Sequence, residues 1–171
     1  TTGDMPLMSE KLASGELIGF DIDMAQAIAE TMGVKLEFRT MPFDHLIPAL
    51  EQGIVDIVLS NMTMTINRNM RIAFAGPYFV SGKCLVTREQ EIARADKPED
   101  LKAANAKITA VKGTTSENFV KALRPLAKLI PVDNIDKGIN IVATGKANAF
   151  LTDIPICMSI MKRYPDSGFQ S

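Results

Sequence analysis

The chain has 171 residues, of which 46% are hydrophobic and 23% are charged, and its formal net charge is −1. This length suits one ordinary domain or two small ones, and the near-neutral charge without a run of Lys or Arg argues against a nucleic-acid partner. No apolar stretch approaches the roughly 20 residues that a membrane-spanning helix needs.

The first third of the sequence changes from turn-forming to periodic segments. Residues 1–15 contain glycine, proline and a polar tract, which predict a loop that leads into a turn. Residues 16–20 are expected to form a short strand or an extended entry. A helix is then predicted from Asp21 or Asp23 to about Met32, because apolar residues recur there at helical spacing.

Three further elements continue this alternation. Residues 34–39 alternate apolar and polar side chains, as a strand with one solvated face does. Asp44 is placed to cap a short helix that runs through Gln52, and the apolar residues 55–59 predict a buried strand. The order strand, helix, strand, helix, strand predicts an α/β fold with a mostly parallel sheet.

A polar stretch, residues 60–68, follows this last predicted strand. It contains the hydroxyls of Ser60 and Thr63, the amide of Asn61 and the guanidinium of Arg68. An arginine can bind a carboxylate through two parallel hydrogen bonds, and polar groups at the carboxyl end of a strand can supply further contacts. These residues are therefore candidates for binding a small anion. The alternative is a polar loop with a solvated Arg68.

Few residues in the sequence suit catalysis or metal binding. His45 is the only histidine, and nothing pairs it with Cys or carboxylates at metal-ligand spacing, so neither a metal site nor a catalytic triad is predicted. No cofactor is expected. Cys84 and Cys157 are expected to be buried thiols rather than a disulfide, because nothing else in the chain is typical of a disulfide scaffold. Phe43 belongs either to the core or to a platform on which a ligand stacks.

Residues 71–87 are strand-like in sequence and are interrupted by Gly76 and Gly82. Extended chain with glycines suits a crossover between domains, and we place the boundary between lobe 1, residues 1–82, and lobe 2, residues 83–171. A second α/β series then begins with a predicted strand over residues 107–111.

This second series carries two further groups of polar residues. Residues 112–116 turn directly into a helix, where Thr115 and Ser116 present hydroxyls and free amides that suit an anion. A strand over residues 129–132, a helix over residues 134–144 capped by Asn134, a strand over residues 149–151 and a helix around residues 156–162 complete the series.

Asp153 directly follows the last predicted strand. It either caps the next helix or binds the cation of a ligand. Two lobes whose polar strand ends meet would form a cleft. Arg68 in one lobe and Asp153 in the other would then match the carboxylate and the ammonium group of a zwitterion.

The sequence resembles type 2 periplasmic solute-binding proteins of family 3, which serve ABC transporters for polar amino acids. The resemblance covers essentially the whole chain. The segments that carry it are Gly19-Phe20-Asp21-Ile22-Asp23, Ile47-Pro48-Ala49-Leu50, Val55-Asp56, Thr63-Met64-Thr65 with Arg68, and Leu151-Thr152-Asp153.

This resemblance implies a two-lobe clamshell, each lobe a mostly parallel sheet flanked by helices, that captures an amino acid or similar carboxylate. The protein would be a non-enzymatic monomer in the periplasm or another extracytoplasmic space, with the membrane subunits of an ABC transporter as partners. Arg68 would bind the α-carboxylate and Asp153 the α-ammonium, and residues 78–83 would form a hinge strand. Further contacts would come from Ser60, Asn61, Thr63, Phe43, Thr115 and Ser116.

Two departures from the family pattern concern the ligand and the chain ends. The first loop reads Asp4-Met5-Pro6-Leu7 where family members usually have an aromatic residue, so the bound side chain stays open, with Asp4 as a candidate contact. The family also has a strand before Thr1 and a return to lobe 1 after Ser171. We therefore expect a chain that is trimmed at both ends.

Two alternatives share this fold. Residues 1–4 are similar to the opening loop of cyclohexadienyl/arogenate dehydratases, but those enzymes carry a Glu three residues after the equivalent of Asp153, where this chain has Ile156. Loss of hydroxide needs a general acid, so this difference argues against the enzyme. The other alternative is the ligand-sensing domain of a receptor or sensor kinase, which the sequence leaves open.

Overall fold

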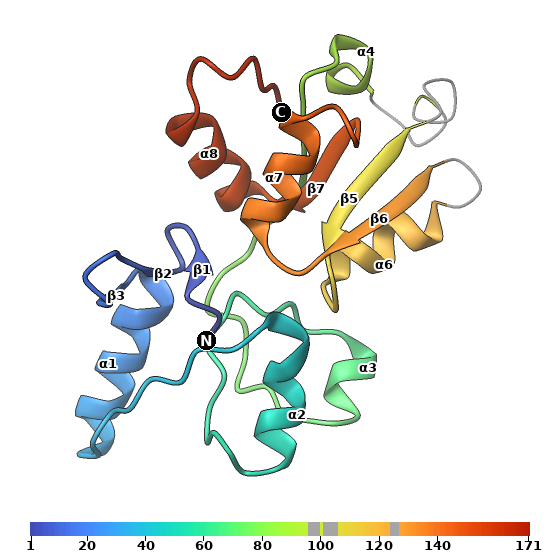
Figure 1. Ribbon diagram of the computed structural model, residues 1–171. Coiled ribbons are helices and arrows are strands. Elements are labelled where there is room, and N and C mark those ends of the chain that lie inside the picture. Colours follow the sequence, from blue (N-terminus) through green and yellow to red (C-terminus); the bar gives the residue numbers. More distant parts are fainter. Residues whose placement is uncertain (96–99, 101–105, 124–126) are drawn as a thin grey trace. The chain divides into compact units, whose positions relative to one another are not determined.

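The computed structural model describes residues 1–95, 100, 106–123 and 127–171, which are shown as coloured ribbon in Figure 1. The chain divides into two compact units, Thr1–Val80 and Ser81–Ser171, called unit 1 and unit 2 below. Each unit has its own secondary structure and core, and each is described by itself.

Unit 1 begins with a small antiparallel sheet in the order β1 (Asp4–Met5), β2 (Ser9–Lys11) and β3 (Leu17–Ile18). The expected loop over residues 1–15 is therefore wrong in part, because this segment folds back on itself and pairs β1 with β2. Helix α1 (Phe20–Met32) follows and ends at Gly33 in the left-handed conformation, which confirms the helix predicted over this stretch.

Gly19 fixes the junction between β3 and α1. Its φ is 123°, and a Cβ atom at this position would lie 2.5 Å from the carbonyl oxygen of Met8. The backbone N–H groups of Phe20 and Asp21 donate to the carbonyls of Leu7 and Met8, which ties the first turn of α1 to the preceding hairpin. Only glycine fits this close approach without moving the backbone.

The rest of unit 1 contains the 3₁₀ turn η1 (Phe43–His45) and the helices α2 (Leu46–Glu51) and α3 (Ile66–Asn69). The strands predicted over residues 34–39 and 55–59 are wrong, since both segments lie outside any helix or strand. Of the alternating apolar residues, Leu36 and Phe38 are half-buried between exposed neighbours, whereas Val34 is 54% exposed. A strand also requires a backbone partner, and within the described part of unit 1 only β1, β2 and β3 form a sheet, an antiparallel one.

Unit 2 is built on a four-stranded sheet in the order β4-β7-β5-β6. Strands β5, β6 and β7 run parallel, as predicted for this half of the chain, and β4 pairs antiparallel with β7. The strands are β4 (Lys83–Thr87), β5 (Lys107–Val111), β6 (Lys128–Val132) and β7 (Ala149–Asp153). The helices are α4 (Gln90–Ala93), α6 (Thr115–Ala122), α7 (Ile135–Ala143) and α8 (Ile154–Arg163).

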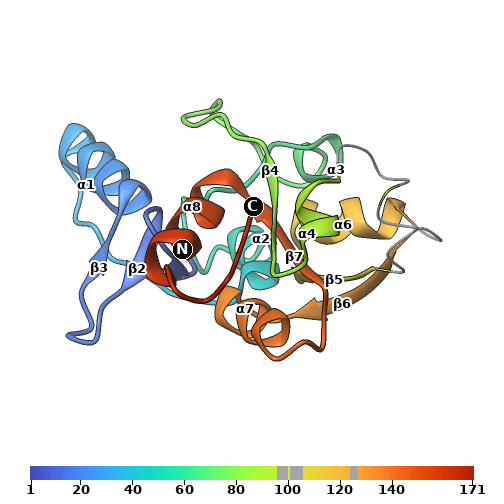
Figure 2. The same ribbon diagram turned by 90° about the horizontal axis from the view of Figure 1, so that it is seen from above.

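Helices cover both faces of this sheet, and Figure 2 shows α6 and α7 on opposite sides of it. On one face, Ile92 of α4 and Val120 of α6 join the buried cluster that includes Ile108. On the other face, Gly138 of α7 lies so close to Phe150 that a Cβ atom there would be 2.8 Å from the ring. Residue Asn134 caps α7 through its side chain, as predicted.

A disulfide joins Cys84 of β4 to Cys157 of α8, with an S–S distance of 2.00 Å and a Cα–Cα distance of 6.3 Å. The expectation of two buried thiols is therefore wrong. The two cysteines are 73 residues apart in sequence, but β4 pairs with β7 and α8 starts directly after β7, so the fold makes them neighbours. That pairing is a tertiary contact which cysteine spacing does not report.

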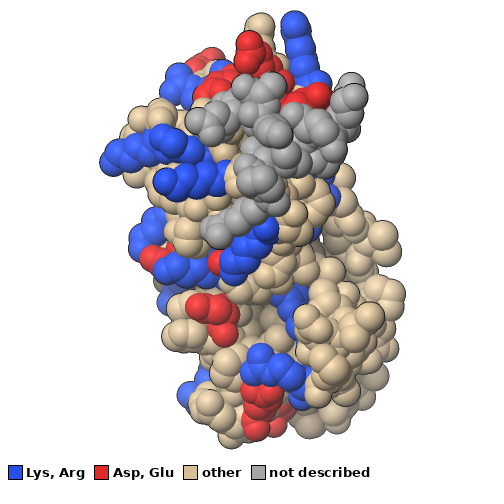
Figure 3. Space-filling model, turned by 90° about the vertical axis from the view of Figure 1, so that its right-hand side faces the viewer, with Lys and Arg blue, Asp and Glu red and all other residues tan. Residues whose placement is uncertain are grey.

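Basic and acidic side chains lie interspersed on the face drawn in Figure 3. Ion pairs within one unit include Arg71 with Glu51 and Lys112 with Asp133. Among the described residues, no helix combines the length and the apolar character that crossing a membrane requires.

Candidate ligand-binding site

Arg68 is held in a fixed position in unit 1 by its own polar segment. The side chain of Thr65 caps α3 by accepting a hydrogen bond from the backbone N–H of Arg68 at 3.3 Å. The guanidinium then folds back, and its Nη1 donates to the carbonyl oxygen of Thr63 at 2.7 Å. Arg68 is only 9% exposed. The structure therefore favours a positioned cation over a polar loop with a solvated Arg68.

The ring of Phe43 packs against the guanidinium group of Arg68. The ring is buried, and the guanidinium carbon of Arg68 lies 5.4 Å from the ring centroid. A cation at this distance from an aromatic face is attracted by the ring quadrupole. Of the two alternatives for Phe43, the structure shows the core position, and direct packing on a ligand stays a prediction.

A hydrogen-bond chain positions the segment that contains Ser60 and Asn61. Ser60 is fully buried, and Asn61 has a φ of 46°, which is uncommon for a residue other than glycine. The backbone N–H of Asn61 donates to the hydroxyl of Tyr78 at 3.1 Å, and that hydroxyl donates to Oδ1 of Asp21 at 2.7 Å. Helix α1 and the end of unit 1 are thereby tied to the candidate segment.

Burial governs the electrostatics of this chain of hydrogen bonds. It raises the pKa of Asp21 above the usual range of a carboxyl group, and the hydrogen bond from Tyr78 partly opposes this shift. Burial also raises the pKa of the Tyr78 phenol, and the neighbouring Asp21 carboxylate raises it further. Tyr78 therefore stays protonated and can donate. Sequence reasoning missed this pair, because Tyr78 and Asp21 are 57 residues apart and only the fold makes them neighbours.

Asp4 belongs to β1, where its backbone is in register with Glu10, and its side chain is exposed. It comes from a different element than Ser60, Asn61, Thr63 and Arg68, which lie within nine residues of one another. Its contact with a ligand stays a prediction.

In unit 2, strand directions bring three polar side chains to one edge of the sheet. Strands β5 and β7 run parallel, so their carboxyl ends meet at the same edge, and the antiparallel β4 begins there. Thr115 follows β5, Asp153 ends β7 and Lys83 starts β4. The Lys83 ammonium donates to Oδ1 of Asp153 at 2.7 Å and to the hydroxyl of Thr115 at 2.7 Å.

The structure distinguishes between the two roles considered for Asp153. It occupies the N-cap position of α8, but its side chain makes no capping hydrogen bond. The carboxylate binds a cation instead, which is the ammonium group of Lys83. Ser116 lies buried beside Thr115 in the first turn of α6, a helix that is capped by Thr114.

From the sequence, Lys83 was expected only as part of the hinge strand of residues 78–83. Its contacts with Asp153 and Thr115 result from the pairing of β4 with β7 and of β7 with β5, which residue spacing does not show. Lys83 also lines a cavity of about 590 Å³ whose walls are mostly apolar side chains of β4, α4, α6 and α8. The Lys83 side chain is 28% exposed and that of Asp153 is 26% exposed. This ion pair is thus half-buried and open to solvent on one side.

The two-unit α/β architecture and these polar strand ends define a type II periplasmic-binding-protein fold. The sequence profile of the bacterial extracellular solute-binding proteins, family 3, matches residues 1–121, and the chain belongs to this family.

Individual relatives agree with this assignment. A probable histidine-binding protein of Neisseria gonorrhoeae is 31% identical over 159 residues, which is 91% of this chain and 58% of the relative. A cyclohexadienyl dehydratase of Pseudomonas aeruginosa is 32% identical over 154 residues, 90% of this chain and 57% of the enzyme. The chain thus spans less than two thirds of the length of these curated relatives.

The solved structures give the same fold. An ancestral arginine-binding protein bound to arginine matches with a TM-score of 0.90 and 34% identity, covering 99% of this chain and 74% of that protein. An ancestral arginine-binding protein bound to glutamine matches with a TM-score of 0.89 and 35% identity, covering 99% of this chain and 74% of that protein.

Proposed function

We propose that the chain captures a polar α-amino acid outside the cytoplasm and delivers it to an ABC transporter. The observation that carries this proposal is the immobilised guanidinium of Arg68, which is buried against Phe43 and anchored on the Thr63 carbonyl. An arginine held in this way offers a preorganised partner for a carboxylate, because little side-chain freedom is lost when a ligand binds.

The residue roles follow from this proposal. Arg68 binds the α-carboxylate, and Ser60, Asn61 and Thr63 contribute backbone and hydroxyl groups. Asp153 binds the α-ammonium group, while Thr115 and Ser116 add contacts from the second lobe, and Asp4 contacts the ligand side chain. Lobes 1 and 2 comprise residues 1–82 and 83–171, and residues 78–83, of which only Lys83 belongs to a strand, form the hinge segment.

The proposed partners and location rest on the family. Its members are extracellular solute-binding proteins, and a Bacillus subtilis relative that is 30% identical is an ABC transporter glutamine-binding protein. We infer that this chain acts as a monomer in the periplasm or another extracytoplasmic space, with the membrane subunits of such a transporter as partners.

Isothermal titration calorimetry with L-arginine, L-glutamine and L-histidine tests the proposal. At least one of them should bind, and Arg68→Ala should abolish the binding, since the carboxylate loses its charged partner. Asp153→Ala should weaken binding and reduce the need for an ammonium group. Arg71→Ala is the matched control, because Arg71 lies three residues further on and pairs with Glu51 at the surface. Normal affinity of the Arg68→Ala protein would refute the assignment.

The similarity to a cyclohexadienyl dehydratase favours a second candidate function, the loss of water and CO2 from a prephenate-like acid, in which the ring carboxylate leaves as CO2 and the hydroxyl leaves with a proton from a general acid. The structure supplies no carboxyl group for the general acid at the expected position. Ile156 stands there, 2% exposed, and the first turn of α8 contains no acidic residue. Incubation with prephenate, followed by assay for phenylpyruvate, tests this candidate, and turnover would make it the primary function.

A further inference from the structure

Lys83 binds Asp153 and Thr115, two of the three unit 2 residues that the proposed function assigns to the ligand. We propose that Lys83 is a specificity-determining residue, whose ammonium group competes with the α-ammonium of an amino acid for Asp153 and Thr115. This inference rests on the proposed function and adds Lys83, which is not among the predicted site residues.

The competition follows from geometry and charge. Both hydrogen bonds of the Lys83 ammonium are 2.7 Å long, and one of them is an ion pair with Asp153. An α-ammonium group presents the same chemistry, a compact cation with three N–H donors. A second cation beside Lys83 and Asp153 would be repelled by Lys83, so a ligand ammonium binds Asp153 best when the lysine side chain moves away.

Lys83 has room for such a movement. Its side chain is 28% exposed, so the flexible stem can turn the ammonium group from Asp153 toward solvent. The backbone of Lys83 stays fixed during this movement. Lys83 and Asp153 are directly opposite in the β4–β7 ladder, and the disulfide of the adjacent Cys84 anchors β4 to α8.

Selectivity is the expected consequence. The ammonium group of an amino acid has to replace that of Lys83 on Asp153, which lowers the affinity that the ammonium group adds. An analogue without the α-amino group can bind with Lys83 still on Asp153. Lys83 therefore narrows the affinity difference between an amino acid and its deamino analogue.

The test compares two matched ligand pairs, L-arginine with 5-guanidinopentanoic acid and L-glutamine with glutaramic acid. Dissociation constants are measured for the parent protein and for Lys83→Met by calorimetry. In Lys83→Met the ratio of the deamino analogue's dissociation constant to that of the amino acid should rise at least about tenfold. The reason is that Asp153 loses its internal cation and accepts only ligands that supply one.

Two control variants and a second test variant accompany this measurement. Lys83→Arg keeps the cation and should leave the ratio within about threefold of the parent value. Lys137→Met removes a lysine of the same unit that pairs with Asp133 at the surface, and it should leave the ratio unchanged. Lys83→Gln keeps a neutral hydrogen-bond donor and is measured beside Lys83→Met, and it alone decides the test if thermal unfolding shows that Lys83→Met does not fold.

The outcomes separate the inference from the proposed function. A ratio that stays constant or falls in both Lys83→Met and Lys83→Gln overturns the inference alone, provided that the parent still binds the amino acid and Arg68→Ala does not. Binding of none of the four probes to either protein overturns the proposed function and the inference with it.

Discussion

At Tyr78, one hydroxyl group satisfies two polar groups that are far apart in the sequence of unit 1. It accepts from the backbone N–H of Asn61 and donates to the buried Asp21 carboxylate. Without it, both groups would be buried with one partner fewer, and the loss of such a partner costs about 1–3 kcal/mol. Tyr78 is therefore a positioning residue for the Ser60–Asn61 segment.

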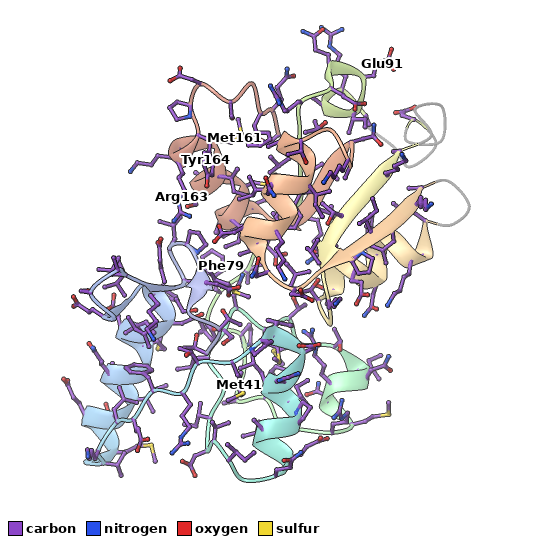
Figure 4. All side chains as sticks on the ribbon, viewed as in Figure 1. Met41, Phe79, Glu91, Met161, Arg163 and Tyr164 are labelled. Carbon is purple, nitrogen blue, oxygen red and sulfur yellow. A yellow bond between two sulfur atoms is a disulfide. The ribbon has the colours of Figure 1, made fainter. Side chains whose placement is uncertain are left out.

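We expect Tyr78→Phe to lower the free energy of unfolding by about 1–3 kcal/mol and to weaken amino-acid binding. Urea unfolding and calorimetric titration measure the two effects. The control is Tyr164→Phe, which changes the only other tyrosine of the chain; Tyr164 ends α8 and its ring packs edge-on against Phe169 (Figure 4). Equal behaviour of the two variants would contradict the positioning role.

Asp133 makes a pH-dependent contribution to stability. Hydrogen bonds from Lys112 and Lys137 lower the pKa of this exposed carboxyl group from 3.8 to about 2. A lowered pKa in the folded state means that the contribution is present above pH 3.8 and is lost as the pH falls through about 2. The free-energy difference between the parent and Asp133→Asn should thus be larger at pH 5 than at pH 3.

Urea unfolding at the two pH values measures this difference. A background with Lys112→Met and Lys137→Met serves as the control, because it removes the cause of the shift. In that background Asp133→Asn should have the same effect at both pH values. An effect that grows toward pH 3 in the parent would have the wrong sign for a lowered pKa.

What the sequence could predict at this scale depends on how local the interaction is. The carboxylate-binding chemistry of Arg68 was predicted because its polar partners lie within nine residues, and the structure places the guanidinium on Thr63. The contact of Lys83 with Asp153 spans 70 residues and that of Tyr78 with Asp21 spans 57. Such contacts follow from strand pairing and core packing, which residue types and spacing alone do not specify.

At the scale of elements, the longer helices and the strands of unit 2 were predicted, whereas the strands predicted over residues 34–39 and 55–59 in unit 1 were wrong. Helices α1, α6 and α7 carry their own caps and periodic faces within one segment, so local sequence suffices to place them. Residues 34–39 have the alternation of a strand and half-buried Leu36 and Phe38, but a ladder also needs a neighbour. The same dependence on a distant partner explains why the disulfide was missed.

The disulfide connects β4, which carries Lys83, to α8, which begins directly after Asp153. A cross-link between residues 73 apart restricts the unfolded chain and typically stabilises the fold by about 2–4 kcal/mol. We expect the double variant Cys84→Ala, Cys157→Ala to lose about this much free energy of unfolding in urea.

Reduction provides the internal control for this prediction. Dithiothreitol should lower the stability of the parent protein toward that of the double variant and should leave the variant unchanged. A parent whose unfolding midpoint is insensitive to reductant, under conditions where thiol titration shows two free cysteines, would contradict the prediction.

For the whole molecule, a ligand stabilises the folded chain by mass action. The proposed function assigns ligand contacts to Arg68 in unit 1 and to Asp153 in unit 2, so every unfolding transition that calorimetry resolves should move upward. An amino acid at 100 times its dissociation constant should add about 2.7 kcal/mol to the free energy of unfolding. Arg68→Ala should remove this stabilisation and Arg71→Ala should keep it. Calorimetry can also resolve two transitions, one for each unit. If the ligand then shifts only one of them, the ligand contacts assigned to the unit with the unshifted transition are wrong.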